Sequence, residues 1–173
     1  MLKKKSKVIN LGCRLNFFES EIIKNILEKE KIEKQIVINT CAVTNQAVRK
    51  SIYEVKKASK ENPDYKIFVT GCASQIDKSA FQELENVSHI VDNKEKTQPE
   101  SYLGKKIRNN DTFNIPFLEN FLSNRTRAML QVQQGCDHRC TFCIIPFGRG
   151  DSKSLAFDEI SKRVGKIIND GFS

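Results

Sequence analysis

In the first half of the chain, short apolar runs alternate with longer segments whose apolar residues recur every three or four positions. The run Val8–Leu11 precedes the periodic segment Glu19–Glu30, and the run Ile36–Thr40 precedes Gln46–Lys60. A third run follows at Lys66–Thr70. Short apolar runs are typical of buried strands, and their alternation with helical segments is typical of βα repeats. The pattern therefore predicts an α/β fold in which the strands form an open parallel sheet.

The same pattern continues less regularly beyond the third run. It predicts a short helix over Lys78–Leu84, a strand over His89–Val91 and a helix over Lys94–Leu103. Residues 104–124 have a mixed pattern, and turn-forming residues interrupt it. We interpret this stretch as a connector on which three aromatic residues pack: Phe113, Phe117 and Phe121.

A second region begins after the connector. It has a strand-like run over Ala128–Gln133, a loop with proline and glycine over Pro146–Gly150, and a helix that opens at Ser154–Glu159. One strand, one loop and one helix cannot enclose a core of their own. We therefore expect residues 1–123 to form an N-terminal domain and residues 124–173 to be the truncated beginning of a second domain.

Composition adds an expected class of partner and an expected compartment. Of the 173 residues, 39% are hydrophobic and 29% are charged, which suits a soluble globular protein. The formal charge of +8 favours an anionic partner such as RNA or DNA, with solvated lysine-rich helix faces as the alternative. Six cysteines without a signal peptide or a membrane-spanning run favour a reducing compartment. We expect a cytoplasmic protein with no membrane partner.

Three of the cysteines close the three predicted strands. Cys13, Cys41 and Cys72 lie 28 and 31 residues apart, each at the end of an apolar run. The carboxyl ends of parallel strands meet at one edge of a sheet, where open α/β folds build their sites. A lone cysteine is more often a small buried hydrophobe. Three cysteines in equivalent positions predict a shared metal or cluster site instead.

The other three cysteines, Cys136, Cys140 and Cys143, lie within eight residues of sequence. Clustered thiolates favour zinc or iron–sulfur chemistry. Zinc or a fully ligated cluster requires a fourth ligand, for which His138 is a candidate. The alternative is a cluster whose fourth iron is left open for a small molecule. The thiolates alone leave all of these sites open.

The Cys-x-x-x-Cys-x-x-Cys spacing resembles that of the radical S-adenosylmethionine (SAM) enzymes. The resemblance implies that Cys136, Cys140 and Cys143 hold a [4Fe–4S] cluster, that SAM binds its fourth iron, and that Phe142 contacts the SAM adenine. It also implies that the second region begins a partial β/α barrel and that an electron donor is a partner. Three arginines close to cysteines in sequence are candidates to stabilise thiolates or to meet SAM or RNA phosphates: Arg14, Arg139 and Arg149.

Taken together, the two cysteine sets are similar to those of the radical SAM methylthiotransferase family. The segments that carry this similarity are Leu11–Asn16, Asn39–Thr44, Thr70–Ala73 and Gln134–Gly150. Within the family, the first two segments most resemble the branch that acts on N6-threonylcarbamoyladenosine in tRNA. The resemblance assigns Cys13, Cys41 and Cys72 to a second, auxiliary [4Fe–4S] cluster. Asn16 and Thr44, which are close to these cysteines in sequence, are candidates to orient them.

The reaction that the resemblance implies takes place on tRNA. SAM cleavage gives a 5′-deoxyadenosyl radical that removes the hydrogen from C2 of the modified adenine, the auxiliary cluster delivers sulfur, and a second SAM supplies the methyl group. Because the rest of the barrel is missing, we expect little turnover by this chain alone. The alternatives are the branches that act on isopentenyladenosine in tRNA or on a ribosomal protein, and a non-catalytic metal-binding module that contacts RNA.

Overall fold

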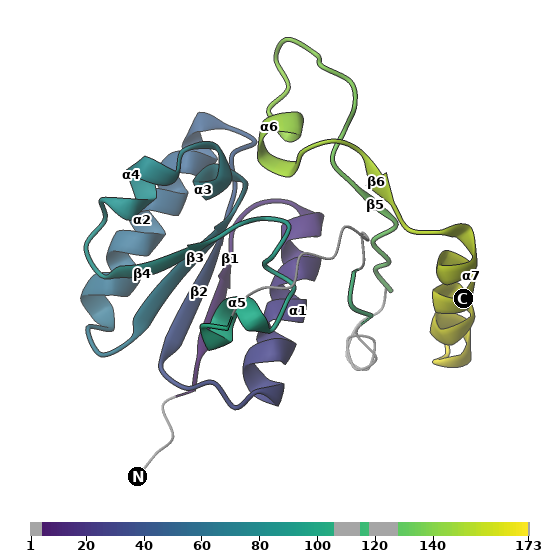
Figure 1. Ribbon diagram of the computed structural model, residues 1–173, viewed down its shortest axis with the longest axis horizontal. Coiled ribbons are helices and arrows are strands. Elements are labelled where there is room, and N and C mark those ends of the chain that lie inside the picture. Colours follow the sequence, from purple (N-terminus) through teal and green to yellow (C-terminus); the bar gives the residue numbers. More distant parts are fainter. Residues whose placement is uncertain (1–4, 106–114, 118–127, 173) are drawn as a thin grey trace.

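The computed structural model describes residues 5–105, 115–117 and 128–172. Its centre is a sheet of four parallel strands in the order β1-β2-β3-β4, each strand beside its neighbour in sequence (Figure 1). The strands are β1 (Lys7–Asn10), β2 (Gln35–Thr40), β3 (Lys66–Gly71) and β4 (Val87–Val91). The predicted α/β fold with an open parallel sheet is therefore confirmed, and the fourth strand forms as expected.

Helices cover both faces of this sheet. One face carries α1 (Arg14–Lys29) and α5 (Glu100–Leu103), and its core includes Ile22 and Ile23 of α1 with Val37 of β2. The other face carries α2 (Asn45–Glu61), α3 (Cys72–Ile76) and α4 (Lys78–Gln82). Every residue of β2 is buried because helices lie on both sides of this central strand, which accounts for its continuous apolar run.

Two helical predictions for this part of the chain need correction. The predicted helix Lys94–Leu103 is wrong over its first half, because only Glu100–Leu103 is helical. Pro99 explains the late start, since the residue before a proline is disfavoured in helical conformation. In addition, α1 begins at Arg14 rather than Glu19, and the short helix α3 has no apolar periodicity that would have predicted it.

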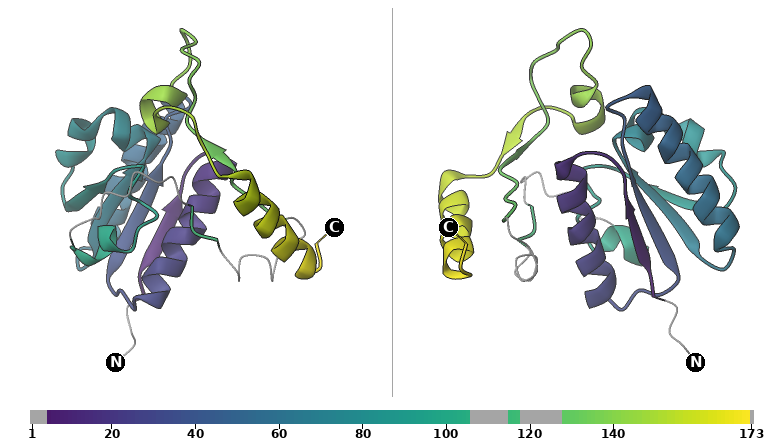
Figure 2. Two further views of the ribbon diagram at one scale, coloured as in Figure 1. Left: turned by 45° about the vertical axis from the view of Figure 1, so that its right-hand side comes forward. Right: turned by 180° about the vertical axis from the view of Figure 1, so that it is seen from behind.

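The second region forms a two-stranded antiparallel ladder and two helices. Strand β5 (Gln133–Gln134) pairs with β6 (Lys153–Ser154), and α7 (Phe157–Asn169) lies on the far side of this ladder from the sheet (Figures 1 and 2). The strand predicted over Ala128–Gln133 is therefore wrong except at its last residue. Only two residue pairs connect the strands. The partner strand is too short to pair with the rest of the apolar run.

The prediction of a loop over Pro146–Gly150 is also wrong. Most of this segment belongs to the short helix α6 (Ile145–Arg149), which has its proline in the first turn. Proline is well tolerated there because the first backbone N–H groups of a helix have no intrahelical partner. Gly150, with φ of 75°, ends the helix. Figure 1 shows α6 above the carboxyl edge of the sheet.

The predicted division between residues 123 and 124 lies outside the described residues, as do Phe113 and Phe121, and it stays a prediction. Phe117 is described. Its ring lies beneath the cationic groups of Arg163 and Lys166, whose distances to its centroid are 5.8 and 5.3 Å. Among the described residues, none of the helices has the length and apolar character needed to cross a membrane.

Candidate functional site

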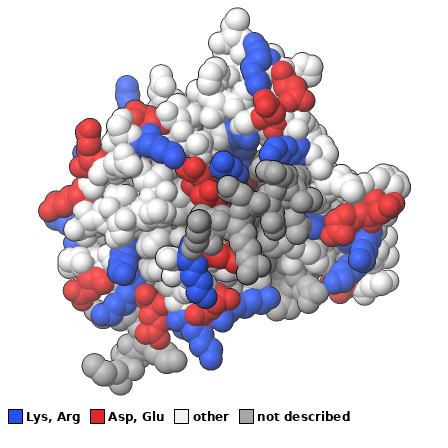
Figure 3. All heavy atoms as spheres, in the orientation of Figure 1, with Lys and Arg blue, Asp and Glu red and all other residues white. Residues whose placement is uncertain are grey.

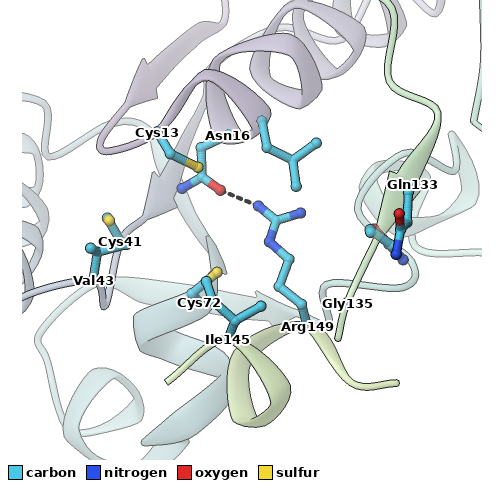
Figure 4. A pocket seen from close by; sticks show the side chains of 11 residues that line it. Cys13, Asn16, Cys41, Val43, Cys72, Gln133, Gly135, Ile145 and Arg149 are labelled. Carbon is cyan, nitrogen blue, oxygen red and sulfur yellow. Dashed lines mark hydrogen bonds between the residues drawn. The ribbon is translucent and has the colours of Figure 1, made fainter. Parts of the chain in front are cut away.

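Cys13, Cys41 and Cys72 lie around one pocket at the carboxyl edge of the sheet. Cys13 is the N-cap of α1, Cys41 follows β2 directly, and Cys72 is the first residue of α3. The pocket has a volume of about 300 Å³, and Figure 4 shows the three side chains around it. Cys41 and Cys72 are buried, whereas Cys13 is exposed. The structure thus brings together the three cysteines that the strand pattern predicted to share an edge.

Two glycines allow the backbone to pass close to these cysteines. Gly12 has φ of 106°, and a Cβ atom there would lie 2.5 Å from both Cβ and Sγ of Cys41. Gly71 has φ of 101°, and a Cβ atom there would lie 2.3 Å from the backbone oxygen of Thr40. Only glycine avoids both the strain and the collision at these positions. Close backbone packing therefore explains the glycines that precede Cys13 and Cys72.

Asn16 ties together the backbone at two of the strand ends. Its side chain is fully buried, and Nδ2 donates to the carbonyl oxygens of Leu11 and Thr40, at 2.8 Å in each case. Leu11 precedes Gly12-Cys13, and Thr40 precedes Cys41. The geometry is compatible with the hypothesis that Asn16 orients cysteines, since its contacts are with the backbone that precedes two of them.

Thr44 has a different role from the one expected. Its Oγ1 accepts a hydrogen bond of 3.1 Å from the backbone N–H of Ala47, so Thr44 is the N-cap of α2. This contact fixes the start of a helix rather than a cysteine side chain.

A buried charged network joins Glu19, Lys96 and Arg149, and it reaches the pocket through Arg149, one of the lining residues. The carboxylate of Glu19 accepts from Lys96 Nζ at 2.6 Å and from the two terminal nitrogens of Arg149 at 2.5 and 2.9 Å. Arg149 also donates to Oδ1 of Asn16, as the dashed line in Figure 4 shows. All three charged side chains are at most 3% exposed. The network links the start of α1, the segment before α5 and the end of α6.

Interactions within the network set the pKa values of its members. Burial alone would raise the pKa of Glu19, but the charges of Lys96 and Arg149 hold it below its usual value. Burial lowers the pKa of Lys96, and Glu19 offsets this only in part. Burial would also lower the pKa of Arg149, but Glu19, with a smaller effect of Cys72, raises it. The carboxylate and the guanidinium therefore hold each other in their charged forms.

Sequence reasoning missed Glu19 and Lys96. A signal for Glu19 was present, because it lies three, four and seven residues before Ile22, Ile23 and Ile26 and so shares the apolar face of α1. A carboxylate on that face requires a buried partner. Lys96 carries no such signal, because the helix predicted over Lys94–Leu103 does not form at Lys96 and so gives no guide to its burial.

The second cysteine set lies on a loop between β5 and α6. Cys136 and Cys143 are partly buried and Cys140 is exposed. The backbone N–H of Cys143 donates to the carbonyl of Cys140 at 3.0 Å, and that of Cys136 donates to Gly150 at 3.1 Å. Arg139 donates to the Cys136 carbonyl at 2.8 Å and pairs with Asp151 at 2.5 Å. Local contacts therefore shape this loop.

Three further residues proposed from the sequence lie in exposed positions. The side chain of Phe142 is 91% exposed, which leaves its ring free to meet a ligand. His138 and Arg14 are also exposed. Within the part of the chain that the structure describes, no three His, Cys, Asp or Glu side chains are close enough together to hold a single metal ion.

The donor set at the sheet edge nevertheless suits a group larger than one ion. All six cysteines are free thiols, and three of them face one pocket. A zinc ion requires its ligands within about 2.0–2.3 Å, whereas an iron–sulfur cluster keeps its thiolates farther apart and prefers soft sulfur donors. Three thiolates on one pocket therefore fit a cluster better than they fit zinc.

Comparison with known proteins assigns the chain to a family. The model described as "Uncharacterized protein family UPF0004" matches residues 5–92, just over half of the chain. The chain belongs to the UPF0004 family. The match covers β1 to β4, and so includes Cys13, Cys41 and Cys72 and ends before the second cysteine set.

Several curated relatives of this UPF0004 chain are named methylthiotransferases. A "Threonylcarbamoyladenosine tRNA methylthiotransferase MtaB" of Rickettsia prowazekii is 38% identical over 97% of the chain and 41% of the relative. The MtaB of Chlamydia pneumoniae is 33% identical over 96% of the chain and 41% of the relative. A "tRNA-2-methylthio-N(6)-dimethylallyladenosine synthase" of Carboxydothermus hydrogenoformans is 31% identical over 99% of the chain and 44% of the relative.

The chain therefore spans about two fifths of the length of these relatives. The resemblance to the methylthiotransferases is confirmed, and the relatives named MtaB are 30–38% identical to the chain.

Proposed function

We propose that the UPF0004 chain carries the two cysteine sites of a tRNA methylthiotransferase that adds sulfur and a methyl group at C2 of N6-threonylcarbamoyladenosine, next to the anticodon. The observation that carries this proposal is the pocket at the sheet edge. Cys13, Cys41 and Cys72 come from three separate strand ends, and the lining also includes Gln134, Gly135 and Arg149, which flank the cysteine loop. The residues that flank the second cysteine set on both sides therefore line the pocket, whereas Cys136, Cys140 and Cys143 themselves do not.

In this proposal each site holds a [4Fe–4S] cluster. Cys13, Cys41 and Cys72 would hold the auxiliary cluster, and Cys136, Cys140 and Cys143 would hold the cluster that binds SAM. Together the bound groups supply radical formation, sulfur and methyl groups. Three thiolates at each site leave one iron open, which suits binding of a small molecule.

The protein's own residues position the reaction. Asn16 holds the strand ends that precede two cysteines, and α6 holds the end of the cysteine loop beside the same pocket. Phe142, exposed on that loop, is available to stack on the SAM adenine. Holding the reacting carbon between two fixed sites lowers the entropic part of the activation free energy of the reaction.

The charge of the chain is compatible with a tRNA substrate. The formal net charge is +8, so phosphate contacts by lysine and arginine would favour binding. On the face seen in Figure 3, basic and acidic side chains are interspersed rather than gathered into one patch. The charge therefore supports a polyanion partner without locating its path on the surface.

The substrate is tested by mass spectrometry of tRNA nucleosides from cells that lack the full-length gene. We expect the methylthio form of N6-threonylcarbamoyladenosine to disappear and its unmethylthiolated form to accumulate. The full-length gene should restore it, whereas a Cys13→Ala version should not. Loss of methylthio-isopentenyladenosine instead would assign the protein to the other tRNA branch.

A further inference from the structure

Arg149 joins parts of the chain that are far apart in sequence. Its guanidinium donates to both carboxylate oxygens of Glu19, 130 residues earlier, at 2.5 and 2.9 Å, and also to Asn16. The Arg149 side chain is only 3% exposed. A buried, two-point arginine–carboxylate pair permits little rotation, so α6 is held in one orientation at the sheet edge.

Two neighbouring contacts hold α6 at the same place. The helix packs on α3, and Gly148 lies so close to Cys72 that an added Cβ would be 3.0 Å from the Cys72 Cβ. The side-chain amide of Asn93 donates to the carbonyl oxygen of Gly148. Because α6 begins two residues after Cys143, these contacts also determine where the cysteine loop ends relative to the pocket.

The charges in the network do not balance among themselves. Lys96 and Arg149 are two cationic groups, and Glu19 is one carboxylate. Arg149 lines the same pocket as Cys72, so its positive charge lies at the sheet edge beside that cysteine. A buried excess charge is costly unless an anion compensates it. A four-iron core with two positive charges and three thiolates carries one net negative charge, which matches the excess.

We propose that Arg149 is a positioning residue that connects the two cysteine sites: it fixes α6 against the sheet edge and, with Lys96, provides the positive charge that balances an anionic cluster beside Cys72. This inference rests on the proposed function, since it takes the pocket to hold an iron–sulfur cluster. It adds residues that act on the cluster through charge and placement rather than as ligands.

The charge half of this proposal is tested by the reduction potential of the auxiliary cluster. All variants are made in a parent protein in which Cys136, Cys140 and Cys143 are replaced by alanine, so that a cluster can form only at the sheet edge. Reduction adds a negative charge, and removing a nearby cation should disfavour it. For Lys96→Met and Arg149→Gln we expect the ratio of reduced to oxidised cluster at a fixed potential to fall about tenfold, equivalent to about 59 mV.

Two controls separate charge from folding. Arg149→Lys keeps the positive charge and should change that ratio by less than about twofold, and so should Lys57→Met, on the exposed surface of α2. Lys96→Met leaves the Glu19–Arg149 pair intact, so it decides the question even where Arg149→Gln does not fold. Unchanged ratios in Lys96→Met and Arg149→Gln would overturn the charge role.

The positioning half is tested with all six cysteines present, by the magnetic interaction between the two reduced clusters in electron paramagnetic resonance. We expect this interaction to weaken or broaden in Arg149→Gln, to be partly rescued in Arg149→Lys and to be unchanged in Lys96→Met. An unchanged interaction in Arg149→Gln would refute the positioning role. If the parent protein binds zinc or no metal at the sheet edge, the proposed function is overturned and this inference with it. Metal analysis of the parent protein detects that result before any variant is compared.

Discussion

The two cysteine sets of this chain are built in different ways. At the sheet edge, Cys13, Cys41 and Cys72 come from three strand ends, and the buried side chain of Asn16 holds the backbone before two of them. The second set lies on one loop, where neighbouring residues supply the contacts that shape it. The ion pair of that loop, between Arg139 and Asp151, has side chains that are 56% and 73% exposed.

The two cysteine sets therefore differ in which contacts hold their backbone in place. The sheet-edge site depends on parallel pairing and on buried polar contacts between residues far apart in sequence, so it should be sensitive to substitutions that never touch a cysteine. The loop site depends on a short, contiguous stretch, so single polar contacts there should matter less. The following substitutions test this contrast.

The largest effect should come from Glu19→Gln. It removes the carboxylate from two buried cations, and breaking a buried ion pair in this way costs about 3–5 kcal/mol of the free energy of unfolding. Urea unfolding of the reduced, metal-free chain measures it. The matched control is Glu28→Gln, at an exposed position of the same helix, which should change stability by less than about 0.5 kcal/mol.

The same pair of proteins gives a pH test. The pKa of Glu19 is held below its usual value of 4.5, so the folded state binds fewer protons at this group than the unfolded state does. Its contribution to stability is therefore present above pH 4.5 and is lost as the pH falls through the lower, folded-state pKa. The stability gap between the wild type and Glu19→Gln should narrow in that range, and a constant gap would contradict the assignment.

A smaller effect is expected for Asn16→Ala. It leaves the buried carbonyls of Leu11 and Thr40 without their side-chain donor, at a cost of about 1–3 kcal/mol. After anaerobic reconstitution, the variant should lose iron from the sheet-edge site and keep it at the loop site. Asn25→Ala, at a half-buried position of the same helix, is the control. Equal iron loss from both sites would remove the distinction between them.

Thr44→Ala should cost about 1 kcal/mol, because it deletes the N-cap of α2. Thr44→Ser keeps a capping hydroxyl and should retain most of that stability. Neither variant should change the amount of iron bound, since the Thr44 side chain caps a helix and does not hold a cysteine. A specific loss of sheet-edge iron in Thr44→Ala would restore the orienting role that the sequence suggested.

The smallest effect should follow from Asp151→Asn. It weakens the exposed ion pair with Arg139, and such pairs contribute no more than about 1 kcal/mol and less at high salt. Unfolding measured at low and at high salt checks this. A salt-independent loss of several kcal/mol would show that the loop is stabilised as strongly as the sheet edge.

The sheet and its cysteine edge could be predicted because strand runs such as Ile36–Thr40 are buried on both sides and end in turns. The position of a cysteine after such a run then follows from parallel topology alone. The loop site was found by spacing. In both cases the signal lies in contiguous sequence.

The buried network could not be predicted in the same way. The partner of Glu19 is Arg149, 130 residues away, and no local pattern connects them. Short elements such as α3 and α6 were missed because five residues are too few to show a helical period. The strand expected from Ala128 failed because its extent depends on a partner strand, which offers only Lys153–Ser154.

The most direct test of the account is the iron and acid-labile sulfide content of the chain after anaerobic reconstitution. Two four-iron clusters predict about eight iron atoms per chain. Replacing Cys13, Cys41 and Cys72 together by alanine should leave about four, and so should replacing Cys136, Cys140 and Cys143. Zinc without iron, or loss of all iron when either set is replaced, would contradict two independent three-thiolate cluster sites.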